Sequence, residues 1–309
     1  MMKQRGMALL VVLMLLAMMA SLAAVVTERW FFSYQYSVQL HQRLQGKWYA
    51  AAAETFAMAL LVLDARDDTQ HTHLAQRWAT SGQRFPLEET ELQAQLIDAQ
   101  ACFNLNAVTG DEEAQRIFTR LLVLLGEETG QAQQIGAALA DWLDEDNLPR
   151  DGGAEDAEYA SFHSPWLTAG QRLQNVSELR QLRGINAALL QRLRPLVCAL
   201  PEAGMKININ TLAPAQWPLL AALAEGTNEA AIRQGLARRP SAGWETLESF
   251  LAEMPALGSQ RRYLGLNSAF FSLRVVVRMA DTNYRQYSLL QRSGGQTKVL
   301  RRYWEIEEG

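Results

Sequence analysis

Apolar residues are concentrated near the start of the chain, where residues 7–26 form an unbroken run. No residue in this run is charged, and Ser21 is its only polar member. An α-helix of about 20 residues spans about 30 Å, the thickness of a bilayer's hydrocarbon core. Lys3 and Arg5 precede the run, and such positive charge stays on the cytoplasmic side. The pattern predicts a single-pass membrane helix with a cytoplasmic amino terminus and the main body on the other side.

The helical pattern continues beyond this membrane segment. Over residues 27–63, apolar side chains such as Trp30, Trp48 and Leu60 recur at roughly helical spacing, and no proline interrupts them. We expect one helix of roughly 50 to 55 residues, half in the membrane and half amphipathic outside it. Two other interpretations stay open: a plain membrane anchor, and a secretory signal cleaved near Ser21-Leu22-Ala23.

Two short segments alternate apolar residues with asparagine. They are Phe103-Asn104-Leu105-Asn106 and Ile207-Asn208-Ile209-Asn210. The alternation predicts short edge strands whose apolar side chains share a buried face. Asn106 and Asn210 are then expected to cap the helices that follow. We prefer this structural interpretation to a catalytic role for the asparagines.

Helical signals dominate residues 107–266, and the last forty residues change to strand-like patterns. Ser293-Gly294-Gly295 marks a turn within an antiparallel sheet of about three strands. A long helix, a helical middle and a final sheet together predict an α+β fold. The predicted helices cover residues 112–125, 130–143, 175–182, 187–196, 217–224, 229–237 and 245–253.

The segment 141–156 carries seven carboxylates in sixteen positions. Such a density repels itself, and a cation would hold the loop compact. Counted from Asp144, Asp146 and Glu155 occupy positions 3 and 12, as two calcium ligands do in an EF-hand loop, but positions 5 and 6 depart from that motif. Oxygen ligands in a flexible loop favour calcium over zinc, and the alternative is a solvated acidic loop. The predicted calcium ligands are Asp144, Asp146, Asp151, Glu155 and Asp156.

Cys102 and Cys198 lie in the part of the chain expected beyond the membrane. In an oxidising compartment, this pair is best interpreted as one disulfide closing a loop of about 95 residues. Two free buried thiols are the alternative. The spacing does not fit a C-x-x-C redox or zinc motif.

The overall charge argues against nucleic acid as a partner. The chain has 33 acidic and 29 basic side chains, a net charge of -4, so it supplies no general field for a polyanion. Residues 176–185 nevertheless resemble a helix-hairpin-helix turn, which can bind DNA phosphates through backbone amides. Nearby arginines are scattered around the helices, so nucleic acid is not expected. A membrane-anchored helix-hairpin-helix DNA-binding protein of the competence type remains the alternative function.

Known catalytic patterns are absent from the sequence. It contains no G-x-S-x-G elbow, Walker loop, H-E-x-x-H or G-x-G-x-x-G. His71 and His73 stand on a polar stretch beside two aspartates, where solvated surface explains them better than a metal site does. We therefore expect that the protein is not an enzyme, and an enzyme behind a simple anchor is kept only as an alternative.

Lys3-Gln4-Arg5-Gly6 directly precedes Met7-Ala8-Leu9-Leu10, and this junction resembles the leader of type IV pilins and pseudopilins. In those families a prepilin peptidase cuts after the glycine, and a glutamate usually occupies the fifth mature position. Here that position is Val11, a departure typical of the type II secretion system protein K family. The acidic segment is similar to that family's D-W-x-D-x-D…G-A-E-x-x-Y segment, which Tyr159 completes. The family is associated with calcium sites.

The resemblance covers essentially the whole chain and implies a pseudopilin fold. In that fold a long amino-terminal membrane helix packs on a carboxy-terminal antiparallel sheet, here with a large inserted all-α domain containing helix-hairpin-helix or SAM-like units. The predicted divisions are a leader at 1–6, a helix at 7–63 (transmembrane 7–26, periplasmic 27–63), core residues 64–106, helical domains at 107–200 and 201–266, and final strands at 267–309.

The resemblance also implies a function in assembly rather than catalysis. The protein would be cleaved after Gly6, N-methylated on Met7 and held in the inner membrane with its body in the periplasm. Its implied partners are the minor pseudopilins I and J, the prepilin peptidase and exported protein substrates. With those pseudopilins it would form the tip of the periplasmic pseudopilus and initiate its assembly for export of folded proteins across the outer membrane. Val11 would prevent growth beyond the tip.

Overall fold

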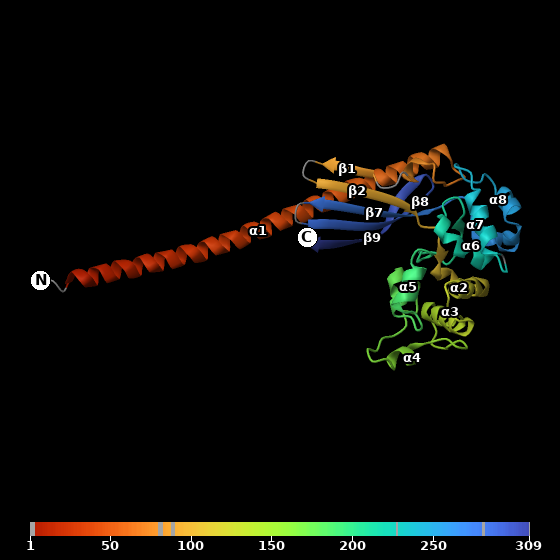
Figure 1. The fold of residues 1–309 in the computed structure, drawn as a ribbon, viewed down its shortest axis with the longest axis horizontal. Coiled ribbons are helices and arrows are strands. Elements are labelled where there is room, and N and C mark those ends of the chain that lie inside the picture. The colour runs from red at the N-terminus through yellow and green to blue at the C-terminus, as the bar shows by residue number, and fades with distance from the viewer. Residues whose placement is uncertain (1–3, 80–82, 88–89, 227, 280–281, 309) are drawn as a thin grey trace.

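A single long helix, α1, projects from a body made of a sheet and a helical domain (Figure 1). The computed structural model describes residues 4–79, 83–87, 90–226, 228–279 and 282–308. Helix α1 covers Gln4–Asp67, 64 residues, and is therefore longer than the sequence predicts. It ends just before Asp68, whose carboxylate accepts hydrogen bonds of 2.9 Å from the backbone amides of Gln70 and His71. Residues 1–3 of the predicted leader lie outside the described residues.

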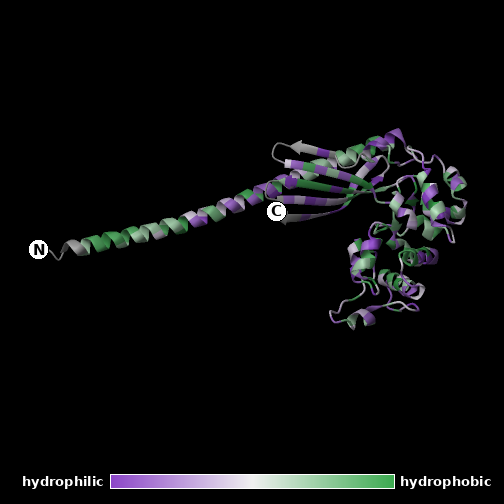
Figure 2. Cartoon of the chain, in the orientation of Figure 1, coloured by the Kyte–Doolittle hydropathy of each residue, from purple (hydrophilic) through white to green (hydrophobic). Residues whose placement is uncertain are grey.

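The amino-terminal part of α1 stands free of the body. This helix is long and apolar enough to cross a membrane, and no residue of its most apolar stretch is buried in the protein. Figure 2 shows that stretch as an almost continuous hydrophobic segment. An unburied apolar helix of this length needs lipid or another apolar partner, as the sequence predicts.

The sheet has five antiparallel strands rather than the predicted three or so. They are β1 (Gln83–Leu87), β2 (Thr90–Asp98), β7 (Phe270–Met279), β8 (Thr282–Ser293) and β9 (Gln296–Glu308), in the order β1-β2-β7-β8-β9. Strand β2 was not predicted because its alternating face carries only two large apolar residues, Leu92 and Leu96, both of which are buried.

The carboxy-terminal part of α1 lies on one face of this sheet. Small residues of the helix, such as Ala50 and Ala57, are buried against Phe271 and Val275 of β7. A Cβ atom at Gly46 would lie only 2.9 Å from the Cβ atom of Tyr284, so glycine is needed for this close approach. The helix and the strands therefore share one hydrophobic core.

A buried ionic cluster fixes the position of α1 on the sheet. Glu54 of α1 is only 3% exposed and forms an ion pair with Arg302 of β9, whose Nε lies 3.0 Å from Glu54 Oε2. The same oxygen accepts hydrogen bonds from Gln286 at 3.0 Å and Ser288 at 2.5 Å, both on β8. A shift of the helix along the sheet would break all three contacts.

The helical domain is inserted between β2 and β7 (Figure 1). Its α-helices agree with those predicted to within about three residues at each end, except that residues 176–180 form a 3-10 helix and that the short helix at 156–160 was not predicted. The α-helices are α2 (Glu112–Leu124), α3 (Thr129–Leu143), α4 (Asp156–Ala160), α5 (Ala187–Leu193), α6 (Trp217–Leu223), α7 (Glu229–Ala237) and α8 (Leu247–Glu253). The 3-10 helices are η1 (Arg77–Ala79), before the domain, and η2 (Leu105–Val108), η3 (Val176–Arg180), η4 (Pro214–Gln216) and η5 (Pro255–Tyr263) within it.

The two asparagine segments begin short parallel strand pairs. Strand β3 (Phe103–Asn104) pairs with β4 (Val197–Cys198), and β5 (Ile207–Asn208) pairs with β6 (Leu264–Gly265). The prediction that the apolar members are buried is confirmed, because Phe103, Leu105, Ile207 and Ile209 are all 0% exposed.

The prediction that Asn106 and Asn210 cap helices was wrong. The Asn106 amide accepts from the backbone N–H of Leu173 at 2.8 Å and donates to its carbonyl at 3.0 Å. Asn210 makes the same pair of bonds to the backbone of Trp244, at 2.8 and 3.1 Å. Both amides are fully buried, so they satisfy distant backbone groups that no strand or helix reaches. Asn104 acts as the cap, for η2.

Cys102 and Cys198 form a disulfide, as predicted. Their Cα atoms are 5.9 Å apart, and they are separated by 96 positions in the sequence. The bond joins the entry of the helical domain to strand β4. It therefore closes the first half of the domain, which contains α2 to α5.

Candidate metal centre and assembly helix

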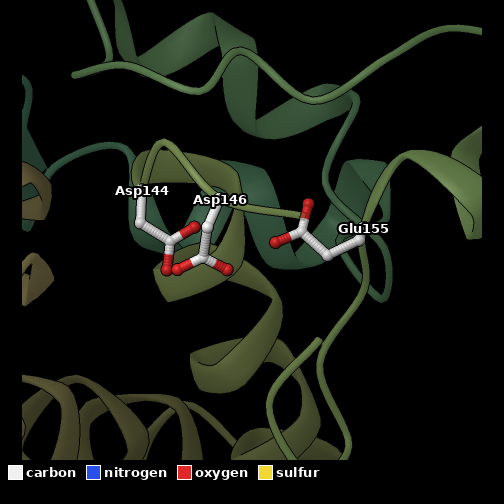
Figure 3. Close-up of side chains that lie close together, drawn as sticks. All are labelled: Asp144, Asp146 and Glu155. Carbon is white, nitrogen blue, oxygen red and sulfur yellow. The ribbon is translucent and has the colours of Figure 1, made fainter. Parts of the chain in front are cut away.

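Three carboxylates of the acidic segment converge where α3 ends and α4 begins. Asp144 follows α3 as its C-cap residue, and Glu155 precedes α4 as its N-cap residue. Asp144, Asp146 and Glu155 each offer an oxygen, and these oxygens all lie within 4.8 Å of one another. Figure 3 shows the three side chains directed toward a common point.

Glu155 lacks the partners that a buried carboxylate needs. It is 4% exposed, and neither of its oxygens has a hydrogen-bond partner among the described residues. One oxygen of Asp144 is buried and unpartnered in the same way. Burial, followed by the charges of Asp141, Asp144, Asp156 and Asp146, raises the pKa of Glu155 to about 7. Unpartnered buried oxygens among like charges are costly unless a cation compensates them.

The other two predicted ligands lie outside this group. Asp156 is engaged by Thr168: its Oδ1 accepts hydrogen bonds from the Thr168 amide at 2.8 Å and from the Thr168 hydroxyl at 2.7 Å. These bonds hold the pKa of Asp156 below its usual range. Asp151 is exposed and stands beside Gly152, whose φ of 73° marks a tight turn. The structure thus brings together three of the five predicted residues.

Sequence reasoning missed the role of Asp141 and Arg150. Asp141 is 0% exposed and accepts hydrogen bonds from the Arg150 backbone amide at 3.2 Å and from its guanidinium at 2.7 Å. The same guanidinium also pairs with Asp144. A Cβ atom at Gly153 would lie 1.8 Å from an Asp141 oxygen, so only glycine fits there. The adjacent Pro149-Arg150-Asp151-Gly152-Gly153 sequence was the available signal, because an arginine before two glycines can fold back on an acid.

An aromatic cluster supports the acidic loop from inside. Tyr159 is 0% exposed and lies edge-on to Trp142, with ring centroids 5.2 Å apart, and stacks with Trp166. Phe162 contacts both Tyr159 and Trp166. The loop therefore rests on a rigid surface that holds the acidic residues near one another.

The family resemblance implies a calcium site, and the three carboxylates have the chemistry that calcium requires. The donors are all oxygens, two of the three residues carry unpartnered buried oxygens, and no described histidine or cysteine belongs to the group. Hard oxygen donors on a loop suit calcium. The residues that would hold the ion are Asp144, Asp146 and Glu155.

Without metal, the stability of the chain is expected to depend on Glu155. Its folded-state pKa of about 7 lies above the ordinary value of 4.5, so its contribution is full below pH 4.5 and is lost as the pH rises through 7. In EGTA, the melting temperature of the wild type should therefore fall between pH 5 and pH 8 more than that of Glu155→Gln. Glu145→Gln, at an exposed position of the same loop, is the control and should keep the wild-type slope. Equal slopes for the wild type and Glu155→Gln would contradict the prediction.

The start of α1 carries the residues predicted for processing and assembly. Gly6 and Met7 lie within the helix, and Met7 is 72% exposed. Val11 is 56% exposed and lies on the apolar stretch, no residue of which is buried in the protein. The predicted cleavage, N-methylation and tip position are chemical and assembly events, so they stay predictions at this point.

An apolar helix packed by its distal half on an antiparallel sheet defines the pseudopilin class of fold, and an inserted helical domain distinguishes this example. Two family models match the chain, both described as type II secretion system (T2SS), protein K, at residues 101–202 and 207–270. Together they span most of the inserted domain. The chain belongs to the type II secretion system protein K family.

Full-length relatives agree with this assignment. Type II secretion system protein K of Klebsiella pneumoniae is 46% identical, over 99% of both chains. The protein of the same name from Pectobacterium carotovorum subsp. carotovorum is 41% identical, over 98% of this chain and 97% of the relative. A solved chain from the GspK-GspI-GspJ complex of enterotoxigenic Escherichia coli matches with a TM-score of 0.80 and 32% identity, covering 87% of this chain and 99% of that one.

Proposed function

We propose that this protein is a minor pseudopilin at the tip of the periplasmic pseudopilus, where it initiates assembly with the minor pseudopilins I and J for export of folded proteins across the outer membrane. The observation that carries the proposal is α1, which has one half packed in the body and an apolar half that is entirely unburied. Such a helix can anchor the subunit in the inner membrane and then supply packing surface to neighbouring subunits. The solved relative in a complex named for K, I and J supports the choice of partners.

The residue at position 11 supports a place at the tip. In related subunits a glutamate at the fifth mature position is thought to pair with the amino terminus of the next subunit. Val11 cannot form that pair, and an unpaired amino terminus in an apolar environment is costly. A further subunit would therefore stack poorly on this one. The bulky helical domain, carried on the body far from the apolar end of α1, is then free to meet exported substrates (Figure 1).

A calcium ion held by Asp144, Asp146 and Glu155 would neutralise the acidic loop. It would join the end of α3 to the start of α4, so its role would be structural. The two unpartnered oxygens of Glu155 are the observation that supports it.

Mass spectrometry of the mature amino terminus tests the pseudopilin proposal. In cells that contain the prepilin peptidase, the protein is expected to begin at an N-methylated Met7. Replacing Gly6 by valine should block cleavage and leave the chain intact from Met1, because the small residue is what the peptidase is expected to recognise. A wild-type protein with an intact Met1, or one that starts at Ala24, would contradict the proposal.

Calorimetric titration tests the calcium proposal. The wild type is expected to bind calcium and to melt at a higher temperature in millimolar calcium, whereas Glu155→Gln should lose most of the affinity. The control, Glu145→Gln, removes one charge of the same loop at an exposed position and should bind as the wild type does. If the wild type releases or absorbs no heat on titration and is not stabilised against heat by calcium, the calcium proposal is wrong.

Two arginines near the helix-hairpin-helix turn are engaged within the protein, which weakens the competence-type alternative. Arg183 donates to the Gly152 carbonyl and lies 3.7 Å from Glu158, and Arg192 pairs with Glu127 at 2.7 Å. Charges used in this way are less available to phosphates. Salt-dependent binding of DNA to the purified protein would be the result that revives this alternative.

A further inference from the structure

A cavity of about 680 Å³ lies where the pseudopilin core meets the helical domain. The end of α1, the β8–β9 turn and the segment that leads into β5 form its walls. This is the end of α1 opposite to the apolar run, close to the helical domain (Figure 1). None of the proposed metal ligands lines the cavity.

Three cationic side chains from distant parts of the sequence line this cavity: Arg66, Lys206 and Arg292. Arg66 and Lys206 are exposed, and neither forms an ion pair within the described part of the chain. The one acidic residue of the lining, Asp68, is already engaged by the His71 side chain at 3.1 Å and by two backbone amides. The cationic side chains of the lining therefore outnumber its single carboxylate.

Arg292 is the most constrained of the three cations. It is only 8% exposed, and its Nη2 donates to Thr72 at 2.7 Å and to the Asn267 side chain and the Ser268 carbonyl at 2.9 Å each. Its guanidinium also lies over the Phe271 ring, 5.0 Å from the centroid. Its Nη1 is shielded from solvent and has no acceptor among the described residues. A buried donor of this kind is costly until an acceptor reaches it.

The buried carboxylate of Asp98 does not fill that role. Asp98 accepts hydrogen bonds from Ser268 and Thr211 at 2.6 Å each, and from Asn208 at 2.9 Å. Its oxygens are thus used by neutral donors, and Asp98 forms no ion pair within the described residues. Burial lowers the pKa of Arg292, and the charges of Asp98, Asp64 and Asp68 oppose that shift.

Two glycines of the β8–β9 turn are among the residues that line the cavity. Gly294 and Gly295 form the β8–β9 turn with φ values of 58° and 76°, which favour glycine over residues with side chains. Neither position has a described atom within 4 Å of where a Cβ would stand, so the space around the turn is open.

We propose that this cavity binds a carboxylate group between Arg66, Lys206 and the Arg292 guanidinium. A guanidinium held in a fixed plane beside two mobile cations matches the charge and the planar shape of a carboxylate. The carboxylate can come from an acidic side chain of a partner protein or from a free carboxylate ion. The site is independent of the tip position and of the calcium centre, since it uses neither Val11 nor the acidic loop.

Fluorescence anisotropy with a labelled hexaglutamate peptide tests the site on the full-length protein in detergent at low salt. The test variant is Arg66→Gln with Lys206→Gln, because these two side chains make no described contact that the fold needs. The matched control is Arg180→Gln with Arg194→Gln, which removes the same charge from two exposed arginines that form no ion pair within the described residues. We expect the test variant to bind the peptide at least about tenfold more weakly and the control to change less than about twofold.

Citrate distinguishes the two sources of the carboxylate. If the peptide binds and citrate competes only weakly, the site recognises acidic side chains of a polypeptide. If citrate stabilises the wild type against heat but not the test variant, while the peptide does not bind, the site takes a free carboxylate ion. Equal weakening of the test and control variants, or no binding of either probe to the wild type, would overturn the proposal.

Discussion

Replacing Cys102 and Cys198 by serine is expected to lower the free energy of unfolding by about 4 kcal/mol. The disulfide closes a loop of 96 positions, and in the chain-entropy model a cross-link over about 100 residues stabilises the folded state by nearly 5 kcal/mol. The β3–β4 pair that it holds has only two residues in each strand, and the bonds of Asn104 to Leu200 and Glu202 add non-covalent links that do not constrain the unfolded chain. Urea unfolding followed by circular dichroism measures the loss.

Reduction of the wild type provides the matched control. With dithiothreitol, the wild type should unfold at the same urea concentration as the double serine variant, and dithiothreitol should not shift the variant further. A loss below about 1 kcal/mol would mean that the packing of α2 to α5 holds the loop without the bond.

Replacing Glu54 by alanine is expected to destabilise the protein by about 3 kcal/mol. The carboxylate is buried and bonded to Arg302, Gln286 and Ser288, so its removal leaves polar groups of two strands without their acceptor. The cost is less than for a fully buried pair because the Arg302 side chain is 44% exposed and can reach water. Thermal unfolding of the variant measures the loss.

The exposed pair between Glu229 and Arg233 is the control for that measurement. Both side chains are 52% exposed and stand four residues apart on α7, so Glu229→Ala should cost no more than about 0.5 kcal/mol. A double replacement of Glu54 and Arg302 by methionine should recover part of the loss, since an apolar pair leaves no charge unpaired. If Glu54→Ala costs no more than Glu229→Ala, the buried cluster does not hold α1 on the sheet.

The helices could be predicted because the sequence signals that determine them lie within each helix and at its ends. Apolar periodicity and breakers placed α2, α3, α6 and α7 within about two residues of their observed ends. The first two strands were missed because β2 depends on pairing with β7, which follows about 170 positions later in the chain. A strand that gains most of its stability from a distant partner leaves a weak local pattern.

The buried asparagines also depend on distant partners that a local sequence pattern does not reveal. Their alternation with apolar residues was visible, and it correctly placed two strands. The bonds of Asn106 to Leu173 and of Asn210 to Trp244 could not be predicted. A capping bond is local, whereas these bonds join segments that are 67 and 34 positions apart. The sequence pattern marked the right residues without showing their partners.

For the acidic loop, the amino-acid composition located the candidate cation site but did not show which of its carboxylates lie close together. Seven acidic positions indicated a cation site, but only the folded loop separates Asp144, Asp146 and Glu155 from Asp156, which bonds to Thr168. Asp141 was passed over because it belongs by sequence to α3, where it is fully buried against Arg150.

The position of the inserted domain has a consequence for how the family can vary. The domain leaves the sheet after Asp98 and returns at Phe270, and these two ends are neighbours: Asp98 pairs with Phe271, and the amide of Ala99 bonds to the Phe270 carbonyl at 3.0 Å. A short turn could therefore replace residues 99–269 and leave β2 and β7 as an ordinary hairpin beneath α1. The length of the insertion can therefore change without altering the order of the strands in the five-stranded sheet.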